Sequence, residues 1–528
     1  MAEIFRSLLP VLASLLSSVL LILAFPPYSL GWLGWVGLVP LFFAISGRNA
    51  KYGFFQAFLC GMIFFALVFQ WVFEVPGYTF LHHSILFVYL GLYFGLFGLL
   101  FSFLYKRSGV TTALFASPFL WVSLEYIRSN MGFMAFPYAW LGYTQHEHPL
   151  VIQIASVAGA FGVSLLLVMV NSAVAAFVLT ILYRSKTLHP MPNRPISNRG
   201  LTLIGGTSAF LVILTMCYGI IVVSKPTMGK KLRVSVVQGN IEQTKKWDPK
   251  QAEFIMQTYF ELTRKALKDQ PDLIAWPEAA TPRAITRDQK IYFQVKQIAE
   301  EAGTPLLLGS SSHQKFSEGR SRKIEFRNSA FLIDPENRAK NQQYDKIHLL
   351  PFGEYLPYGE SVLWSWINVP KVNPTIPGKE FTIFQCPTFR FAAPICWENL
   401  FPDLPRKFVK NGAQFLVNIT NEAWFDRGVG PQHYVISSVF RAVENRVYVV
   451  RCANTGISCF IDPYGRITGR VQKDGKDTIV EGYLTRPVYL SEERTFYTRH
   501  GYLFPYLCLL VSAVMTGVSL WRVNRWKS

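Results

Sequence analysis

The stretch FAAPICWENLFPDL, residues 391–404, places Cys396 directly after a short strand-like run and two residues before Glu398. A structural cysteine needs only apolar neighbours, because it behaves as a small hydrophobe. A nucleophilic cysteine needs a nearby base, a positive charge and hydrogen-bond donors for an oxyanion. The motifs elsewhere in the chain therefore decide which kind of cysteine this is.

Two other motifs place charged residues just beyond apolar, strand-like runs. LIAWPEAATP puts Glu278 after one run, and YDKIHLLPFGEYLP puts Lys346 and Glu354 in a loop after another. Each alone has an ordinary explanation, as a helix cap, a solvated lysine or a structural thiol. Residues beyond the carboxyl ends of strands gather at one rim of a layered α/β domain, so we expect Glu278, Lys346 and Cys396 to converge. A strand-to-helix turn also favours the thiolate of Cys396.

These motifs lie in residues 231–490, where short β-rich runs alternate with amphipathic stretches. Strands are expected at LRVSVVQ, PLLLGSS, NSAFLIDP, FRFAAPI, AQFLVNIT and VYVVRCAN. Helices are expected near residues 251–269, 289–302 and 434–445. Strands that alternate with helices across short turns predict an α/β layered domain.

The rest of the chain is strongly apolar, and hydrophobic residues make up 51% of the 528. Most of its apolar segments reach the roughly 17–25 residues that a helix needs to cross a bilayer. The second and fifth are short or interrupted. We predict a polytopic α-helical membrane domain of about eight spans, with seven in residues 1–225 and one at 502–521. The first seven segments are residues 8–25, 31–45, 53–73, 84–105, 111–127, 162–183 and 201–223.

Basic residues cluster in every second connection between these segments. Positive residues accumulate on the cytoplasmic side of a membrane. We therefore predict that both termini are cytoplasmic and that residues 231–490 are outside, in the periplasm of a Gram-negative cell. The basic residues are Arg6; Arg48 and Lys51; Lys106 and Arg107; Arg184, Lys186, Arg194 and Arg199; and Arg522, Arg525 and Lys527.

The net charge of +19 does not indicate nucleic-acid binding. Residues 231–498 hold 36 Lys and Arg against 29 Asp and Glu, so only +7 belongs to the water-facing part. The other +12 flanks the apolar segments, where topology and anionic headgroups account for it. No nucleic-acid motif occurs, and we expect no nucleic-acid partner.

The sequence gives little reason to expect a metal. Its seven cysteines include no CxxC pair with metal-ligand spacing. Cys452 and Cys459 either form a disulfide in an oxidising compartment or remain two buried thiols. The HEH triplet at 146–148 could bind a metal, but no third ligand follows at a suitable spacing. No metal or other cofactor is expected.

The motifs WPE, DKIHLLPFGEYLP and ICWEN resemble the nitrilase superfamily, whose members carry a Glu–Lys–Cys triad on an αββα sandwich. The whole chain is similar to the apolipoprotein N-acyltransferase family, and FPYAWLGYTQ, VVQGNIEQTKKW and NITNEAWF support this resemblance. It implies an enzyme of the bacterial inner membrane that moves an acyl chain from a phospholipid. The acceptor would be the α-amino group of the N-terminal diacylglyceryl-cysteine of an apolipoprotein.

The resemblance also implies roles for individual residues. Cys396 would be the nucleophile that becomes a thioester, Glu278 the general base, and Lys346 the cation beside the oxyanion, aided by a backbone N–H near Trp397. Four further residues follow in the same way: the supporting residues Glu354, Trp397 and Glu398, and the substrate-binding Trp247 in a mobile loop.

Two other functions compete with this one. A membrane-tethered amidase of the nitrilase type would use the same triad to hydrolyse an amide, although eight spans exceed what a tether needs. A transporter or lipid-binding receptor would show ionisable residues within its spans. Few occur, and Glu125 and Arg128 at the outer end of the fifth segment are expected to form an interfacial pair.

Overall fold

The chain folds into two compact units, each described by itself. The computed structural model describes residues 2–184, 196–226, 229–246, 248–318, 321–336, 342–369, 372, 374–425 and 428–524. The helical unit comprises Met1–Phe73, Tyr78–Lys225 and His500–Ser528, and the α/β unit comprises Glu74–Gly77 and Pro226–Arg499.

The helical unit contains six helices that are long and apolar enough to cross a membrane, among the residues that the structure describes. They are α3 (Ala50–Val68), α4 (Phe80–Ser108), α5 (Val110–Ser129), α8 (Ala160–Arg184), α9 (Asn198–Val223) and α17 (Leu503–Asn524). The predicted polytopic helical domain is therefore confirmed. The shorter elements are α1 (Ala2–Leu23), α2 (Val39–Ile45), α6 (Pro149–Ile152), α7 (Ala155–Ala158) and the 3₁₀ helices η1 (Gly31–Trp35), η2 (Gln70–Glu74), η3 (Gly132–Met134) and η4 (Leu141–Gln145).

The second and fifth apolar segments, which are short or interrupted in the sequence, adopt different structures. The second is broken into η1 and α2, and Pro40 lies in the first turn of α2, where a proline costs no helical hydrogen bond. The fifth forms one continuous helix, α5, which carries Pro118 in its interior. The described apolar part of α1, Leu8–Leu23, is also shorter than the six long helices.

Glu125 and Arg128, expected as an interfacial pair, are both buried inside the helical unit. The Glu125 carboxylate accepts hydrogen bonds from Trp121 Nε1 (2.9 Å) and from the backbone N–H of Leu141 (2.8 Å). The Arg128 guanidinium lies over the ring of Phe65, 5.2 Å from its centre. A buried charge needs such partners. The carboxylate joins α5 to η4, which explains an ionisable residue in an apolar helix.

The α/β unit is built on two main sheets. The larger has the strand order β12-β1-β2-β3-β4-β5, in which β1, β2 and β3 are parallel neighbours and the other pairs are antiparallel. The smaller has the order β11-β10-β9-β8, with β8 parallel to β9. The strands are β1 (Lys231–Gln238), β2 (Leu273–Ala275), β3 (Leu306–Glu318), β4 (Ser321–Ile333), β5 (Gln342–Asp345), β8 (Leu416–Thr420), β9 (Val449–Ala453), β10 (Cys459–Ile461), β11 (Ile467–Arg470) and β12 (Gly482–Tyr489), besides the hairpin β6 (Phe384–Cys386) and β7 (Phe389–Phe391).

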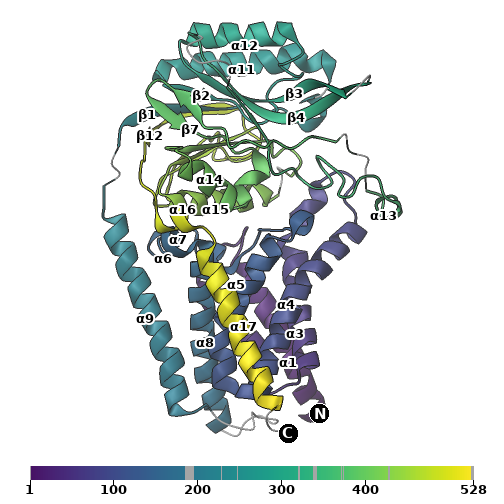
Figure 1. Cartoon of the computed structure of the whole chain (residues 1–528), viewed down its shortest axis with the longest axis vertical. Helices are drawn as coiled ribbons and strands as arrows, with labels where there is room; N and C mark the ends of the chain where they lie inside the picture. The colour runs from purple at the N-terminus through teal and green to yellow at the C-terminus, as the bar shows by residue number, and fades with distance from the viewer. Residues whose placement is uncertain are drawn as a thin grey trace. The chain divides into compact units, whose positions relative to one another are not determined.

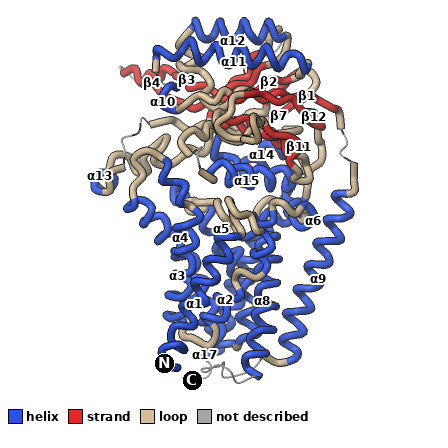
Figure 2. The backbone as a smooth tube through the Cα atoms, turned by 180° about the vertical axis from the view of Figure 1, so that it is seen from behind, coloured by secondary structure: helices blue, strands red, loops and turns tan. Residues whose placement is uncertain are grey.

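Helices cover the outer face of each sheet. Figure 1 shows α11 and α12 side by side over the larger sheet, and Figure 2 shows α14 and α15 beyond the strands on the opposite side. The layers run helix, sheet, sheet, helix, so the predicted αββα sandwich is confirmed. The helical elements are α10 (Gln243–Lys246), η5 (Pro249–Gln251), α11 (Ala252–Ala266), η6 (Leu267–Asp269), α12 (Gln289–Ala302), α13 (Val362–Trp366), η7 (Cys396–Leu400), α14 (Asp403–Lys410), α15 (Gly430–Asn445) and α16 (Phe496–His500).

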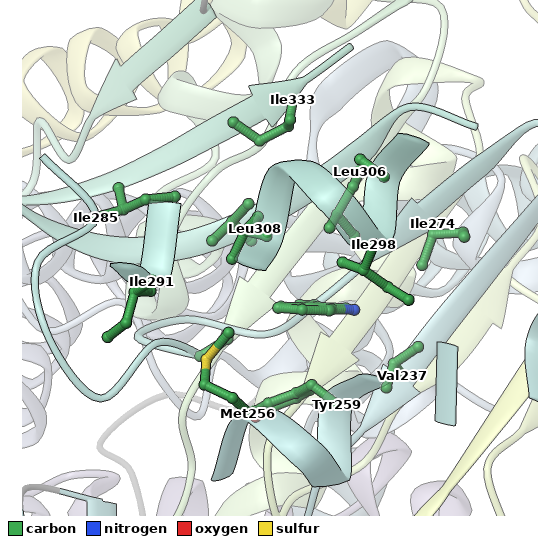
Figure 3. Packing of buried hydrophobic residues seen from close by; sticks show 14 of the residues in the cluster. Val237, Met256, Tyr259, Ile274, Ile285, Ile291, Ile298, Leu306, Leu308 and Ile333 are labelled. Carbon is green, nitrogen blue, oxygen red and sulfur yellow. The ribbon is translucent and has the colours of Figure 1, made fainter. Parts of the chain in front are cut away.

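One hydrophobic cluster joins α11 and α12 to the larger sheet, and its side chains interdigitate in Figure 3. Met256 and Tyr259 come from α11, and Ile298 comes from α12. The Trp276 ring stacks on Tyr259 at 5.0 Å, and Trp276 Nε1 donates to Thr263 Oγ1 (3.0 Å). Full burial of such a side chain contributes about 1.5–3 kcal/mol. The cluster therefore fixes the backbone where β2 ends, three residues before Glu278.

The turn that follows β2 packs directly against Gly309 in β3. A Cβ added to Gly309 would lie 2.6 Å from Glu278 Cα and 2.7 Å from the backbone nitrogen of Ala279. Because both contacts are to backbone atoms, neither can move aside cheaply. The absence of a side chain at this position is what lets the Glu278 turn lie flat on the sheet.

We predict that Gly309→Ala lowers the free energy of unfolding by about 1–3 kcal/mol, the usual cost of overpacking. The measurement is the thermal midpoint of the purified chain in detergent. Gly482→Ala in β12 is the matched control, because its added Cβ would meet a single flexible side-chain atom, Val471 Cγ1 at 3.1 Å. Equal midpoints for the two variants would contradict the close packing of the turn.

Candidate active site

Glu278 is held by donors from three separate segments. It lies in the turn after β2 and is 7% exposed. Its Oε1 accepts hydrogen bonds from Asn328 Nδ2 (2.8 Å) and from Lys346 Nζ (3.5 Å). Its Oε2 accepts one from the backbone N–H of Asn421 (2.8 Å). The carboxylate therefore has a fixed orientation in a site that excludes most water.

Lys346 follows β5 directly and is 2% exposed. Its ammonium donates to Glu354 Oε1 at 3.0 Å, lies 2.9 Å from Glu354 Oε2, and reaches Glu278. Burial alone would lower the pKa of Lys346, but the charges of Glu354 and then Glu278 outweigh it and hold that pKa above its usual value. The side chain is therefore a permanent cation.

Cys396 lies at the first position of η7. Its backbone is left-handed (φ +54°), a conformation that residues other than glycine rarely adopt. The extended residues before it join β8 through bridges from Ala392 to Leu416 and from Ile395 to Ile419. Asn418 Nδ2 donates to the carbonyl oxygens of Pro394 (3.0 Å) and Cys396 (3.1 Å). The turn is thus clamped on both sides of the thiol.

The expected preference for the thiolate is wrong. Burial, followed by the charge of Glu278, raises the pKa of Cys396 to about 12, and Lys346 only partly opposes this. The five-residue η7 separates Cys396 from the next α-helix, α14, which begins at Asp403. No long helix therefore points its N-terminus at the sulfur within this segment. Cys396 rests as a neutral thiol and needs a base.

Asn328 is a site residue that was not predicted from the sequence. Its side-chain nitrogen, on β4, donates to Glu278 Oε1 (2.8 Å) and to Glu354 Oε1 (2.8 Å). Glu354 Oε2 also accepts the backbone N–H of Leu350 (2.7 Å). Asn328 therefore bridges the two carboxylates that flank Lys346. A single asparagine within a strand carries no sequence signal of this kind.

Glu398 and Trp397 act on the backbone around the site. Glu398 is fully buried, which raises its pKa to about 7. Its Oε1 accepts the backbone N–H of Ile347 (2.7 Å) and of His348 (3.0 Å), and its Oε2 accepts that of Ile395 (2.7 Å). Trp397 Nε1 donates to the carbonyl oxygen of His348 (2.6 Å). Both side chains tie the loop after Lys346 to the Cys396 turn.

The remaining sequence predictions have mixed outcomes. Trp247 lies outside the described residues. Cys452 and Cys459 are free, buried thiols, and Cys452 Sγ donates to the carbonyl oxygen of Ala275 (3.2 Å). Among the described residues, no group of three or more His, Cys, Asp and Glu side chains could hold a metal ion.

Family models match both the N-terminal and the α/β part of the chain. A family model described as the apolipoprotein N-acyltransferase N-terminal domain matches residues 17–173, and one described as carbon-nitrogen hydrolase matches residues 233–482. An apolipoprotein N-acyltransferase of Geobacter metallireducens is 34% identical over 521 residues, which cover 97% of this chain and 95% of that protein. The chain belongs to the apolipoprotein N-acyltransferase family. The family relative from Chlorobaculum tepidum is 29% identical and covers 97% of each chain.

The solved structures similar to the chain include members of the nitrilase superfamily. Saccharomyces cerevisiae Nit3, from branch 10 of that superfamily, is 19% identical with a TM-score of 0.36. The match covers 50% of this chain and 92% of Nit3.

We predict that Glu398→Gln lowers the thermal midpoint of the purified chain. The glutamine retains one acceptor oxygen and turns an NH₂ group toward backbone N–H donors, and an unpaired buried donor costs about 1–3 kcal/mol. Glu253→Gln is the control, because that side chain is 71% exposed and pairs with the exposed Lys290 at 3.5 Å. A midpoint for Glu398→Gln equal to that of the control would contradict the bridging role of this carboxylate.

Proposed function

We propose that this chain transfers an acyl group from a phospholipid, through a thioester on Cys396, to the α-amino group of the N-terminal diacylglyceryl-cysteine of an apolipoprotein. Membership of the family supports the reaction class. The observation that carries the mechanism is the buried Glu278 carboxylate, which is held in one orientation and paired with the Lys346 ammonium, while the charges of both act on the thiol of Cys396. No metal or cofactor takes part in any step.

The first half-reaction forms the acyl-enzyme. Glu278 removes the Sγ proton of Cys396 as the sulfur attacks the ester carbonyl of the phospholipid, forming the S–C bond. The ammonium of Lys346 stabilises the oxyanion of the tetrahedral intermediate. The ester C–O bond then breaks, and Glu278 returns the proton to the departing lysophospholipid oxygen. Glu278 ends the step as a carboxylate.

The second half-reaction uses the same groups in the same order. The neutral amine of the acceptor attacks the thioester, and Glu278 takes a proton from its nitrogen. The C–S bond breaks, and Glu278 gives that proton to the sulfur, which restores the thiol and leaves an amide. A thioester stores acyl-transfer potential, so the amide forms without ATP. Both substrates carry lipid chains, which suits a chain whose α/β unit is flanked in sequence by membrane-spanning helices.

The supporting residues keep these groups aligned. Glu354 and Asn328 fix Lys346 and Glu278 relative to each other, while Glu398 and Trp397 fix the loop after Lys346 to the Cys396 turn. Trp247 is proposed to contact substrate. The partners are thus a phospholipid donor, a diacylglyceryl-modified apolipoprotein and the lipid bilayer.

A hydrolytic amidase is the second candidate, since it would use the same triad. The match of residues 17–173 to the N-terminal domain of the family, together with relatives over 97% of the chain, favours the transferase. A transferase must keep water from discharging the thioester until an amine arrives. The two candidates therefore differ in the lifetime of the acyl-enzyme.

The protein is a multi-pass protein of the bacterial inner membrane. We propose in addition that the α/β unit is periplasmic and that both termini are cytoplasmic. This orientation rests on the alternation of basic residues along the connections.

The acyl-enzyme tests the proposed chemistry. Purified protein incubated with phospholipid and no acceptor should gain one acyl mass on the peptide that contains Cys396, removable by neutral hydroxylamine. Addition of a diacylglyceryl-cysteinyl peptide should discharge that mass into an amide, with ping-pong kinetics. Intact-protein and peptide mass spectrometry measure both steps.

Two variants serve as controls for the acyl-enzyme. Cys396→Ala should gain no mass, and Glu278→Gln should gain it at least about a hundredfold more slowly, as expected for loss of a general base. Steady release of free fatty acid without acceptor, and without an accumulating adduct, would support the amidase and contradict the transferase.

Reporter fusions test the orientation. Alkaline phosphatase fused after Val223 should be active, because that connection leads into the proposed periplasmic unit. The same reporter fused after Ser528 should be inactive, because the C-terminus is proposed to be cytoplasmic. The reverse result at either site would overturn the topology.

A further inference from the structure

A second lysine lies buried beside the candidate base. Lys246, at the end of α10, is 1% exposed, whereas its neighbour Lys245 is 48% exposed and pairs with Glu242 at the surface. The ammonium of Lys246 donates to the backbone carbonyl oxygen of Glu278 at 3.1 Å. Burial of a cation costs several kcal/mol unless nearby groups compensate it. A buried lysine at this place therefore requires a negatively charged environment.

The segment that carries Lys246 is fastened to the site by two asparagines. Asn454 accepts the backbone N–H of Ile241 at 2.9 Å and donates to the carbonyl oxygen of the same residue at 2.7 Å. Asn421 Nδ2 donates to Gln243 Oε1 (2.9 Å), while the backbone N–H of Asn421 binds the Glu278 carboxylate. Lys246 is thus held in a fixed position relative to the base.

The formal charges of the site show what Lys246 supplies. Glu278 and Glu354 both contact Lys346, and the three groups together carry one formal net negative charge while Cys396 is a thiol. A thiolate or an oxyanion would have to form against that charge. Lys246 brings the sum to zero. Glu278, from the turn after β2, and Cys396, from η7, are the titratable groups that act electrostatically on Lys246, and Lys346 and Glu354 lie next to Glu278.

We propose that Lys246 is a second cation of the active site, a positioning and electrostatic residue that lets negative charge develop on Cys396 and on the substrate oxygen. This inference rests on the proposed function, since it assigns Lys246 to the step that forms the thioester. Lys346 is already paired with two carboxylates, and their negative charges offset much of its positive charge. Lys246 supplies the charge that remains for the reaction.

Lys246 should lose its proton, and with it its positive charge, just above neutral pH. Burial lowers the pKa of Lys246 to about 8, and the charges of Glu278 and Cys396 only partly oppose this. The group is protonated below that pH and neutral above it. Self-acylation of the wild-type protein should therefore slow as the pH rises through about 8, although a higher pH favours ionisation of a thiol. The acceptor is absent from this assay, so its amine does not affect the profile.

Three variants separate the charge from the hydrogen bond. Lys246→Gln can still donate to the Glu278 carbonyl oxygen but has no charge, and its initial rate of self-acylation at pH 7 should fall about tenfold or more. Lys246→Arg keeps the charge and should retain acylation without the decline near pH 8, because arginine stays protonated. Lys245→Gln is the matched control and should behave as the wild type.

Alkylation of Cys396 by iodoacetamide gives a readout that does not depend on the acyl donor. Because thiolate is the reactive form, Lys246→Gln should be alkylated about tenfold or more slowly than Lys245→Gln at pH 7. The thermal midpoint of each variant is measured first, so that only folded variants are compared. The pH profile of the wild type tests the proposal without any substitution. Equal alkylation rates, or a wild-type profile with no decline above pH 8, would overturn the role of Lys246. Failure of the wild type to acquire any acyl mass would instead overturn the proposed function.

Discussion

The buried ammonium of Lys346 is the constraint around which the rest of the site is arranged. An uncompensated charge at 2% exposure would cost several kcal/mol. The carboxylates of Glu354 and Glu278 offset this cost, and Asn328 holds both of them through one side-chain nitrogen. These groups come from the turn after β2, from β4 and from the loop after β5. Satisfying one cation therefore locks three segments of the larger sheet into a single geometry.

The Cys396 turn belongs to the other sheet and is joined to this assembly by backbone contacts. Glu398 accepts hydrogen bonds from backbone N–H groups of both the turn and the loop after Lys346. Asn418 on β8 donates hydrogen bonds to two carbonyl oxygens of the turn. The sulfur and the base thus come from different sheets of the sandwich. Their alignment depends on buried polar side chains such as Glu398 and Asn418, which explains why buried acids and amides surround the three proposed reacting groups.

The sequence predicted that Glu278, Lys346 and Cys396 would converge, but it did not predict the residues that hold them in place. Glu278, Lys346 and Cys396 each lie in a proline-containing motif beyond an apolar run, and that pattern is visible in the sequence itself. Asn328 and Lys246 were missed because their importance comes from contacts with segments far along the chain. The thiolate prediction for Cys396 failed because burial and the charge of Glu278 raise the pKa of the thiol, and both come from tertiary contacts that the sequence does not show. The strand β12 was also missed, since GYLTRPVY holds a proline that suits only an edge strand.

The pairing of β12 with β1 has a consequence for how the α/β unit is made. Lys231 lies opposite Tyr489, and the side chains of Ser235 and Thr485 are hydrogen-bonded across 250 residues of sequence. One edge of β1 therefore stays unpaired until β12 has left the ribosome. At roughly 5–20 residues per second, that interval lasts on the order of 10–50 seconds. An open strand edge can pair with other chains. Because β12 is synthesised last, the larger sheet is completed late. Until then, the open edge of β1 must be kept from pairing with other chains.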